Sequence, residues 1–294
     1  MRILVTNDDG IESEGIHVLA RAVAAAGHEV VVVAPSTNWS GAGAALGDLR
    51  PDQPLSVRRV EIPGAADLEA WALDGPPALC VVAGRLGAFG AEPELVVSGI
   101  NAGLNTGRAI LHSGTVGAVL AGQNFGISGL AVSAETAEPW HWDTAAELAV
   151  EVLPLVIDGP ARTALNLNVP ALPRAGIRGV RWARIAPLGA VRARLRGSDD
   201  EQVQFSLEPT GYEPPEDTDQ GACDAGYAAL TTLVGIVEAW PDPVESEEFE
   251  LAVADSSGVT VRLEPGAELH EVHTIPDATD HRLLRRPELG VIPD

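Results

Sequence analysis

Short apolar runs, separated by polar loops that contain glycine, recur along roughly the first 170 residues of the chain. Each run is apolar over nearly its whole length, which is typical of strands buried on both faces of a parallel sheet. The runs are RILVT (2–6), EVVVVAP (29–35), ELVVSGI (94–100), GLAVS (129–133) and TALNLNVP (163–170). Their order predicts a sheet built from successive β-α-β units.

Helical spacing of apolar residues fills the gaps between several of these runs. Residues 12–26 carry apolar side chains three and four positions apart, and Gly27 follows as a helix end. Further segments are interpreted as helices at 76–89, 115–126 and 142–157, as a partly exposed strand at 55–62, and as loops at 36–49 and 101–115. The alternation predicts a Rossmann-like α/β fold in three layers, with a mostly parallel sheet between helices.

The pattern becomes irregular after about residue 175. Short strand-like runs are separated there by polar, proline-rich loops; the runs are 177–186, 203–207 and 226–233. We therefore divide the chain into a Rossmann-like catalytic core, residues 1–172, and a β-rich C-terminal region, residues 173–294, with an extended tail after about residue 234. The segment EPPEDTDQGACDAG (213–226) is expected to be exposed to solvent.

Residues 208–225 are acidic and rich in proline, and they contain too few apolar side chains to build a core of their own. We expect this segment and the strands around it to reach onto a second subunit. Exchange of an arm between identical subunits is a common route to symmetric assemblies. The expected assembly is a homodimer or a dimer of dimers.

The net charge of the chain limits the kinds of molecule that it can bind, and its cysteines bear on its location. The chain of 294 residues has 42 acidic and 19 basic residues, a formal net charge of −23, and no lysine. Such a chain repels nucleic-acid polymers and anionic membranes, and without lysine it cannot form a P-loop. Cys80 and Cys223 lie far apart in the sequence, which favours a reduced, cytoplasmic location. We see neither a membrane-spanning run nor a signal peptide.

Oxygen-bearing side chains follow three of the predicted strands. Because ligands of open α/β sheets bind beyond the carboxyl ends of the strands, these loops are expected to face one crevice. The side chains are Asp8, Asp9, Ser40, Asn101 and Asn105. Two adjacent carboxylates repel each other, and a hard divalent cation removes that repulsion. The pattern therefore predicts one Mg²⁺ or Mn²⁺ ion per subunit, and the absence of a His or Cys cluster disfavours zinc.

The stretch HSGTVGA (112–118) leads into a predicted helix, and the N–H groups at a helix start can bind an anion. A cation next to an anion site indicates a phosphate ester as the substrate. Each feature also has a simpler explanation. An Asp-Asp-Gly stretch is usually a turn, Ser40 and Asn101 can serve turns, Ser113 can be an N-cap, and His17 and His112 are expected to be structural or exposed.

The blocks ILVTNDDGIESEGIHVLARAV, VVVVAPSTNWSGAG, PELVVSGINAGLNTG and HSGTVGAVLAG resemble the motifs of the SurE (survival protein E) family, over residues 1 to about 170. TDQGACDAGYAALTTL (218–233) resembles a later block of the family more weakly. The resemblance implies a metal-dependent phosphatase acting on nucleoside monophosphates at the 5′ or 3′ position, a Rossmann-like fold and an arm exchanged in a dimer. It implies metal ligands at Asp8, Asp9, Ser40 and Asn101, and phosphate contacts at Asn105, Ser113, Gly114 and Thr115.

Several positions depart from the family pattern. Trp39 precedes Ser40 where a basic residue is frequent, His112 stands where tyrosine is common, GPPALC (75–80) lacks the usual Thr and Asp, and the helix GAVLAGQ lacks an acidic residue. These differences leave the expected cation and phosphate positions intact and bear on the leaving group. Trp39 can stack on a flat ring, so we expect a preference for esters with an aromatic or heteroaromatic group.

The expected reaction is phosphomonoester hydrolysis, with Asp8 or Asp9 accepting a proton from the attacking water. One alternative is an aspartyl-phosphate phosphatase with Asp8 as nucleophile. Enzymes of that type usually carry Asp-x-Asp and a nearby lysine, whereas here Asp8 and Asp9 are adjacent and the chain has no lysine. A second alternative is a non-catalytic nucleotide-binding or scaffold protein on the same fold, which the intact set of oxygen ligands disfavours.

Overall fold

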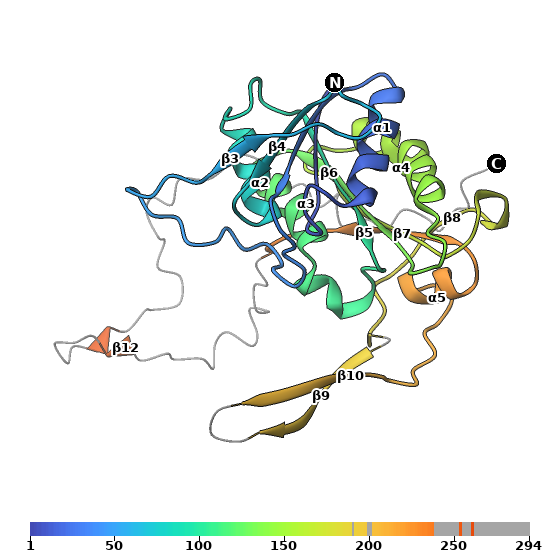
Figure 1. Ribbon diagram of the computed structural model, residues 1–294. Coiled ribbons are helices and arrows are strands. Elements are labelled where there is room, and N and C mark those ends of the chain that lie inside the picture. Colours follow the sequence, from blue (N-terminus) through green and yellow to red (C-terminus); the bar gives the residue numbers. More distant parts are fainter. Residues whose placement is uncertain (190, 199–201, 238–252, 255–259, 262–294) are drawn as a thin grey trace. The chain divides into compact units, whose positions relative to one another are not determined.

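A nine-stranded mixed sheet forms the centre of the computed structural model, which describes residues 1–189, 191–198, 202–237, 253–254 and 260–261 (Figure 1). The strand order is β3-β4-β2-β1-β5-β6-β7-β11-β8. The first five strands in chain order are β1 (Arg2–Thr6), β2 (Glu29–Pro35), β3 (Val57–Arg59), β4 (Glu69–Leu73) and β5 (Leu95–Ala102). They are followed by β6 (Ser128–Ala134), β7 (Ala164–Val169), β8 (Val180–Trp182) and β11 (Ala228–Leu233).

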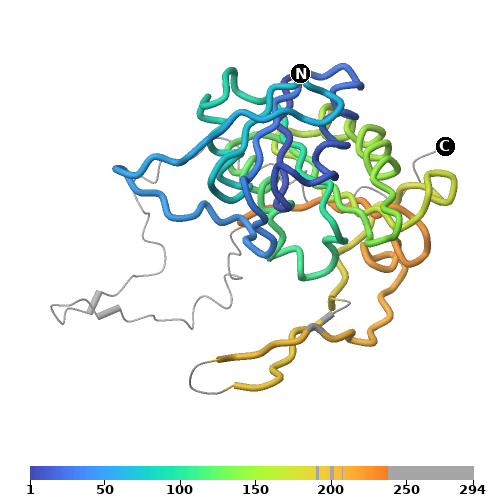
Figure 2. Tube along the Cα trace, in the orientation of Figure 1, coloured from blue at the N-terminus to red at the C-terminus, as the bar shows by residue number. Residues whose placement is uncertain are grey.

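The direction of the chain across the sheet reverses between β1 and β5. From β1 the chain passes outward through β2 and β4, and it then returns to β5 and continues through β6 and β7 on the other side (Figure 2). All of these neighbours pair in parallel. A reversal of this kind leaves a crevice beyond the carboxyl ends of the two strands, where ligands of such folds bind.

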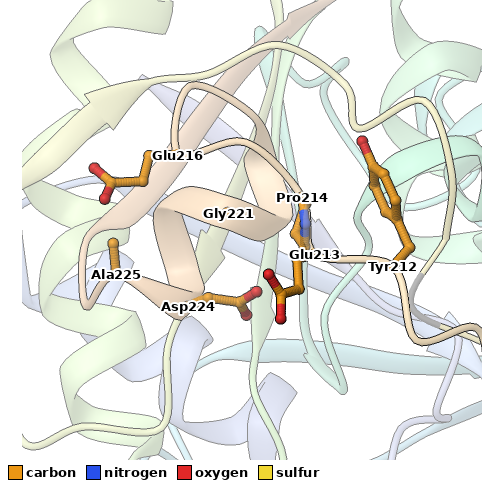
Figure 3. A pocket seen from close by; sticks show the side chains of 7 residues that line it. All are labelled: Tyr212, Glu213, Pro214, Glu216, Gly221, Asp224 and Ala225. Atoms are coloured by element: carbon orange, nitrogen blue, oxygen red, sulfur yellow. The ribbon is translucent and has the colours of Figure 1, made fainter.

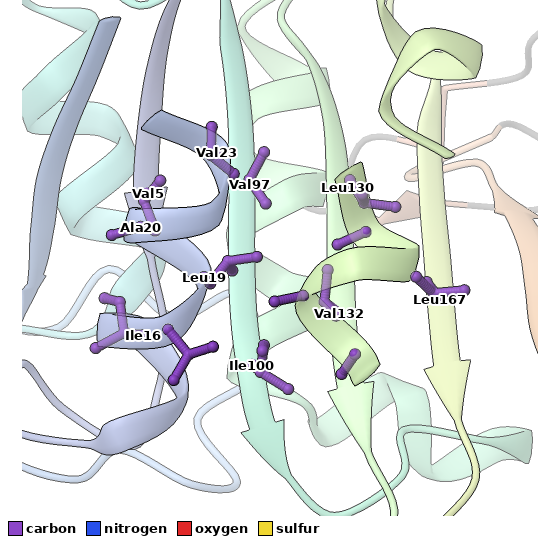
Figure 4. Packing of buried hydrophobic residues seen from close by; sticks show 14 of the residues in the cluster. Val5, Ile16, Leu19, Ala20, Val23, Val97, Ile100, Leu130, Val132 and Leu167 are labelled. Atoms are coloured by element: carbon purple, nitrogen blue, oxygen red, sulfur yellow. The ribbon is translucent and has the colours of Figure 1, made fainter. Parts of the chain in front are cut away.

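Helices cover both faces of the sheet. The helices are α1 (Glu14–Ala25), α2 (Pro77–Arg85), α3 (Gly114–Asn124), α4 (Trp142–Ile157) and α5 (Asp219–Asp224). One apolar cluster joins the sheet to α1 and α4, and Figure 4 shows Ile16, Leu19 and Val23 against the sheet residues. A second cluster joins the opposite face to α2 and α3. The three-layer α/β fold expected from the sequence is thereby confirmed.

The predicted bounds of helices and strands agree best with the structure where the hydrophobic pattern extends over many residues. The helix expected over 142–157 has those bounds as α4, and the strand expected over 163–170 is β7. The strands expected at 55–62 and 177–186 shrink to three residues each, β3 and β8. The loop expected over 101–115 is partly wrong, because a 3₁₀ helix, η1 (Gly107–His112), lies within it. Such short helices carry little periodic signal.

The exposure expected for residues 213–226 is also wrong in part. Thr218 and Asp219 are buried, and α5 packs Ala222 and Cys223 into a small apolar cluster with Tyr227. Small side chains allow this close approach. An added Cβ at Gly221 would lie 2.0 Å from the carbonyl oxygen of Pro215. Because this segment is acidic and rich in proline, its sequence did not indicate that it contains a short buried helix.

Two strands, β9 (Val191–Ser198) and β10 (Val203–Pro209), pair with each other in an antiparallel sheet of their own. Three apolar side chains on this hairpin are exposed: Leu195 by 55%, Val203 by 57% and Phe205 by 66%. A hairpin with so little apolar burial is marginally stable by itself. The described residues therefore include a separate antiparallel sheet in the expected β-rich C-terminal region.

Met1–Gly235 belong to one compact unit, in which β8 and β11 complete the same sheet as β7. Of the second unit, Ile236–Arg286, the structure describes mainly β12 (Val253–Ala254) paired with β13 (Thr260–Val261). Most of the tail expected after residue 234 lies outside the described residues. The functional division at residue 172 stays a prediction. In the part of the chain that is described, no helix has the length and apolar character needed to cross a membrane.

Candidate active site

The turn that carries Asp8 and Asp9 is locked by a buried asparagine. Asn7 accepts the N–H of Gly10 at 3.2 Å and donates to the Gly10 carbonyl at 3.0 Å and to the Ser13 hydroxyl at 2.7 Å. Gly10 has a φ of 98°, a conformation that suits glycine. Asn7 is fully buried, and the sequence analysis did not single it out. Its bonds hold the two carboxylates at the carboxyl end of β1.

Asp8 is directed at the first turn of α3. One carboxylate oxygen accepts the N–H of Gly114 at 3.0 Å, and the other accepts the hydroxyl proton of Thr115. The side chain is almost fully buried. Burial raises the pKa of Asp8, against the opposing effect of these hydrogen bonds. The helix start thus already holds one anion, which is the Asp8 carboxylate.

The SGT stretch already has contacts to Asp8. The Gly114 N–H and the Thr115 hydroxyl donate to its carboxylate, and the phosphate contacts expected at these two residues stay a prediction. Ser113 is the N-cap of α3 and accepts the N–H of Val116 at 3.1 Å. A hydroxyl that accepts one bond keeps its own proton for another acceptor. Asn105 and Ser113 are therefore the expected phosphate donors that remain available.

Asp9 joins three segments of the chain. One of its oxygens accepts the N–H of Ala102 at 3.1 Å, next to Asn101, and the other lies 3.4 Å from the amide nitrogen of Asn38. The Asn38 oxygen in turn accepts the N–H of Ser40 at 2.8 Å. The turn after β1, the loop after β2 and the carboxyl end of β5 are therefore linked through a single carboxylate. Burial is the first cause that raises the pKa of Asp9, and the Asp8 charge adds to it.

The Ser40 loop is also fixed by its backbone and by glycine packing. The N–H of Trp39 donates to the Asp8 carbonyl at 2.7 Å, and the N–H of Gly43 donates to the His112 carbonyl at 3.0 Å. An added Cβ at Gly117 in α3 would lie 2.3 Å from the Gly43 carbonyl oxygen. Only a glycine at that position lets the loop lie directly against α3. The loop is thereby placed beside the helix start that holds Asp8.

Asn101 stands at the end of β5, in register with Ser133 of β6. Its amide nitrogen donates to the Gly103 carbonyl at 2.6 Å, which leaves the amide oxygen as the atom that can face a cation. Asn105 donates from its own amide nitrogen to the Ser133 hydroxyl at 2.9 Å. Ser133 is thus the register partner of Asn101 and the hydrogen-bond partner of Asn105.

The donors that surround Asp8 and Asp9 fit a hard divalent cation. Among the described residues, neither carboxylate forms an ion pair with an arginine. Nor does any group of three His, Cys, Asp or Glu side chains in that part of the chain form a metal site. A cation here would need the neutral oxygens of Ser40 and Asn101 as well, and such oxygen sets suit Mg²⁺ or Mn²⁺. Raised pKa values imply that protons compete with the cation at higher pH than they do at ordinary carboxylates.

The remaining singled-out side chains lie at the margin of the site or away from it. Trp39 is half-buried, and its indole nitrogen is buried without a hydrogen-bond partner among the described residues. His112 is exposed, and His17 is buried with a ring nitrogen 2.8 Å from the Ile11 carbonyl oxygen. Both histidines match the structural or exposed roles expected for them.

A separate hollow of about 340 Å³ lies along the segment that leads into α5 (Figure 3). Its lining residues are Tyr212, Glu213, Pro214, Glu216, Gly221, Asp224 and Ala225. None of them belongs to the expected site, and three of them are acidic. A phosphate ester would be repelled there, so this hollow is not the candidate active site.

The fold and the site together define a doubly wound α/β protein with an acidic, oxygen-rich centre at its topological switch point. The family model of survival protein SurE matches residues 3–189. The chain therefore belongs to the SurE family.

Individual relatives agree with this assignment. The chain is 42% identical over 269 residues to the 5′-nucleotidase SurE of Xanthomonas euvesicatoria pv. vesicatoria, with 90% of this chain and 99% of the relative covered. It is 37% identical over 238 residues to the 5′-nucleotidase SurE of Aeromonas hydrophila, covering 79% and 92%. The crystal structure of SurE protein from Aquifex aeolicus matches with a TM-score of 0.67 at 34% identity, covering 79% of this chain and 93% of that one.

Proposed function

We propose that the protein is a divalent-cation-dependent phosphomonoesterase that hydrolyses nucleoside monophosphates. The observation that carries the proposal is the linkage of three segments at strand ends through Asp9, beside the α3 start that holds Asp8. Membership of a family whose curated relatives are named 5′-nucleotidases supports a nucleotidase function. Activity at the 3′ position is part of the proposal and rests on the resemblance of the motifs.

The proposed division of roles follows from the contacts. Asp8, Asp9, Ser40 and Asn101 would hold one Mg²⁺ or Mn²⁺ ion. When bound, this cation supplies Lewis-acid polarisation of a phosphate oxygen and lowers the pKa of a nearby water. Asn105 and Ser113 donate to the phosphate oxygens, where charge develops in the transition state. Gly114 and Thr115 keep Asp8 in place.

The reaction transfers the phosphoryl group to water. The water oxygen forms a bond to phosphorus while the ester P–O bond breaks. Asp8 or Asp9 accepts the water proton, and the leaving oxygen takes a proton and departs as the alcohol of the nucleoside. The products are inorganic phosphate and a nucleoside, and no external oxidant or co-reactant is required.

One assay separates this function from its two alternatives. Purified protein is incubated with p-nitrophenyl phosphate and a panel of 5′- and 3′-nucleotides, with Mn²⁺ or Mg²⁺ and with or without EDTA. We expect turnover that EDTA abolishes and added Mn²⁺ or Mg²⁺ restores. A phosphorylated protein trapped by rapid quenching would instead favour the aspartyl-phosphate mechanism. Absence of turnover with every ester would favour the non-catalytic protein.

We expect the protein to assemble through the hairpin formed by β9 and β10, whereas α5, at the end of the segment 208–225, packs within its own subunit. Leu195, Val203 and Phe205 are exposed on this hairpin, and their burial against a second subunit would release water from apolar surface. Light scattering at micromolar concentration is expected to show a dimer or a tetramer, and Phe205→Glu is expected to shift it toward the monomer. Leu86→Glu, which alters an exposed leucine after α2, should have no such effect. A monomeric wild-type protein would contradict the prediction.

We expect Trp39→Ala to lower kcat/KM for nucleoside monophosphates by about tenfold, since stacking on a base contributes roughly 1–3 kcal/mol. The backbone N–H of Trp39 donates to the Asp8 carbonyl, and Trp39 directly precedes Ser40. Its stacking would favour monophosphates with a flat ring over di- and triphosphates. Hydrolysis of glycerol phosphate should change little. Equal losses on both substrates would indicate that Trp39 shapes the loop and does not contact the leaving group.

A further inference from the structure

The peptide of Asn105 is held by buried asparagine side chains from β7. The oxygen of the Asn168 side chain accepts the N–H of Asn105 at 2.8 Å, and its nitrogen donates to the Asn105 carbonyl at 3.0 Å. Asn166 donates to the same carbonyl at 2.9 Å. Both asparagines have no exposed surface. Because they are two positions apart on one strand, their side chains lie on the same face of the sheet.

Burying amide side chains in an apolar strand is costly unless their polar groups are paired. Residues 164–169 read ALNLNV, so the two asparagines replace the apolar residues that this buried strand otherwise carries. Both amide groups are directed to the backbone N–H and C=O of one loop residue more than 60 positions away. A strand that needed only stability would carry apolar side chains here. The free-energy cost of burying these two amides indicates that they have a role beyond stability, which is to fix the position of Asn105.

The same loop is tied from its other end by α5. One oxygen of the fully buried Asp219 accepts the N–H of Gly107 at 2.8 Å. The hydroxyl of Thr106 donates to the Gln220 side-chain oxygen at 2.7 Å. Residues 105–107 are therefore fixed at three consecutive positions by side chains from two separate elements.

The orientation of the Asn105 side chain is also fixed, by a hydrogen bond to Ser133. Its amide nitrogen donates one proton to the Ser133 hydroxyl, which leaves one N–H for another acceptor. Ser133 is fully buried and lies in register with Asn101 across β5 and β6. The free N–H of Asn105 is thus fixed beside the strand position that supplies a proposed cation ligand.

We infer that Asn168, assisted by Asn166, is a positioning residue that aims the Asn105 amide at the phosphate of the substrate. The inference rests on the proposed function, in which Asn105 donates to phosphate. Asn168 acts through Asn105 and does not touch the substrate. Fixing the peptide in advance removes the need to order the loop when phosphate binds, so phosphate affinity is gained without a new contact.

The test measures the affinity of inorganic phosphate for the Mn²⁺-loaded protein by calorimetry, together with Mn²⁺ affinity and thermal stability. Asn168→Ala is expected to weaken phosphate binding by about tenfold, the equivalent of ~1.4 kcal/mol. Mn²⁺ affinity should stay within about twofold, because Asn168 bonds to no proposed cation ligand. Asn166→Ala, which removes only one of the bonds to the carbonyl, should weaken phosphate binding by about threefold.

Thr231→Val is the matched control. Thr231 is a buried residue of β11 that pairs in register with Asn166, and its hydroxyl donates to the Ala183 carbonyl at 3.1 Å. The variant loses one buried side-chain bond without touching Asn105. It is expected to lower stability as Asn166→Ala does, and to leave phosphate affinity unchanged.

A double-mutant cycle with Asn105→Ala separates positioning from a general structural role. Once the Asn105 amide is removed, adding Asn168→Ala should weaken phosphate binding by less than about twofold further. Additive losses, or a loss of phosphate affinity in Thr231→Val equal to that in Asn166→Ala, would overturn the inference. Should Asn168→Ala not fold, the same cycle with Asn166→Ala decides the matter. If Asn105→Ala alone leaves phosphate affinity unchanged, the proposed phosphate role of Asn105 fails, which is a different outcome.

Discussion

Asp9→Asn is expected to lower kcat/KM by about a thousandfold or more while the fold is retained. Asp9 accepts the N–H of Ala102 and approaches the Asn38 amide, so it joins the end of β5, which carries Asn101, to the loop that carries Ser40. The substitution keeps the shape of the side chain and removes its charge. It also risks turning an amide N–H toward the N–H of Ala102. Loss of several kcal/mol of electrostatic stabilisation corresponds to this change in rate.

The measurement is steady-state hydrolysis of a nucleoside monophosphate across a range of Mn²⁺ concentrations, with circular dichroism as the check on folding. Asp52→Asn serves as the control, because Asp52 is an exposed residue outside the site. It makes the same chemical change and should leave turnover unaffected. Turnover of the Asp9→Asn protein near the wild-type level would show that Asp9 is not a ligand of the catalytic cation.

Gly114→Ala is expected to lower kcat/KM by about a hundredfold through Asp8. A Cβ at this position would lie 2.6 Å from the Asp8 Cβ and 2.8 Å from one of its carboxylate oxygens. Neither distance is compatible with normal packing, so Asp8 has to shift away from the helix start. A misplacement of about 1 Å in an active site can cost on the order of 10²-fold in rate.

Gly122→Ala in the same helix is the matched control. There the added Cβ would meet a methyl group of Val96 at 3.2 Å, which a small side-chain adjustment can relieve. Both variants make the same Gly→Ala change in α3, and Gly122, inside the helix, gains about 1 kcal/mol of helix propensity. Only Gly114→Ala should lose activity and weaken the binding of Mn²⁺. Unchanged kinetics in the Gly114→Ala protein would mean that the contact with α3 does not position Asp8 for catalysis.

Periodicity in the sequence was enough to predict the layers of the fold. The apolar runs of β1, β2, β5, β6 and β7 and the helical spacing of α1 and α4 are local patterns, and each is determined by burial within one element. The expectation failed where the signal is short or mixed. The 3₁₀ helix η1 has no repeat to detect, and the acidic, proline-containing context of α5 concealed its buried small residues.

Some of the residues that hold the expected site in place could have been predicted from the sequence. Asn166 and Asn168 alternate with leucine in an otherwise apolar strand. Polar residues at a period of two on a buried strand face one side, so this signal could have identified them as partners of a neighbouring loop. Asn7 gave a weaker signal, since an asparagine in a turn usually serves the turn alone.

By itself the sequence determined the order of the elements, the mostly parallel sheet and the placement of Asp8, Asp9, Ser40 and Asn101 at or after the carboxyl ends of strands. Tertiary structure alone decided that the donors of Gly114 and Thr115 serve Asp8, and that Asn168 holds the peptide of Asn105. The physical reason is distance along the chain. Burial periodicity acts over a few residues, whereas these hydrogen bonds join groups 63 to 107 positions apart. Their pairing depends on how whole elements pack, because a buried donor takes whichever acceptor the packing brings within reach.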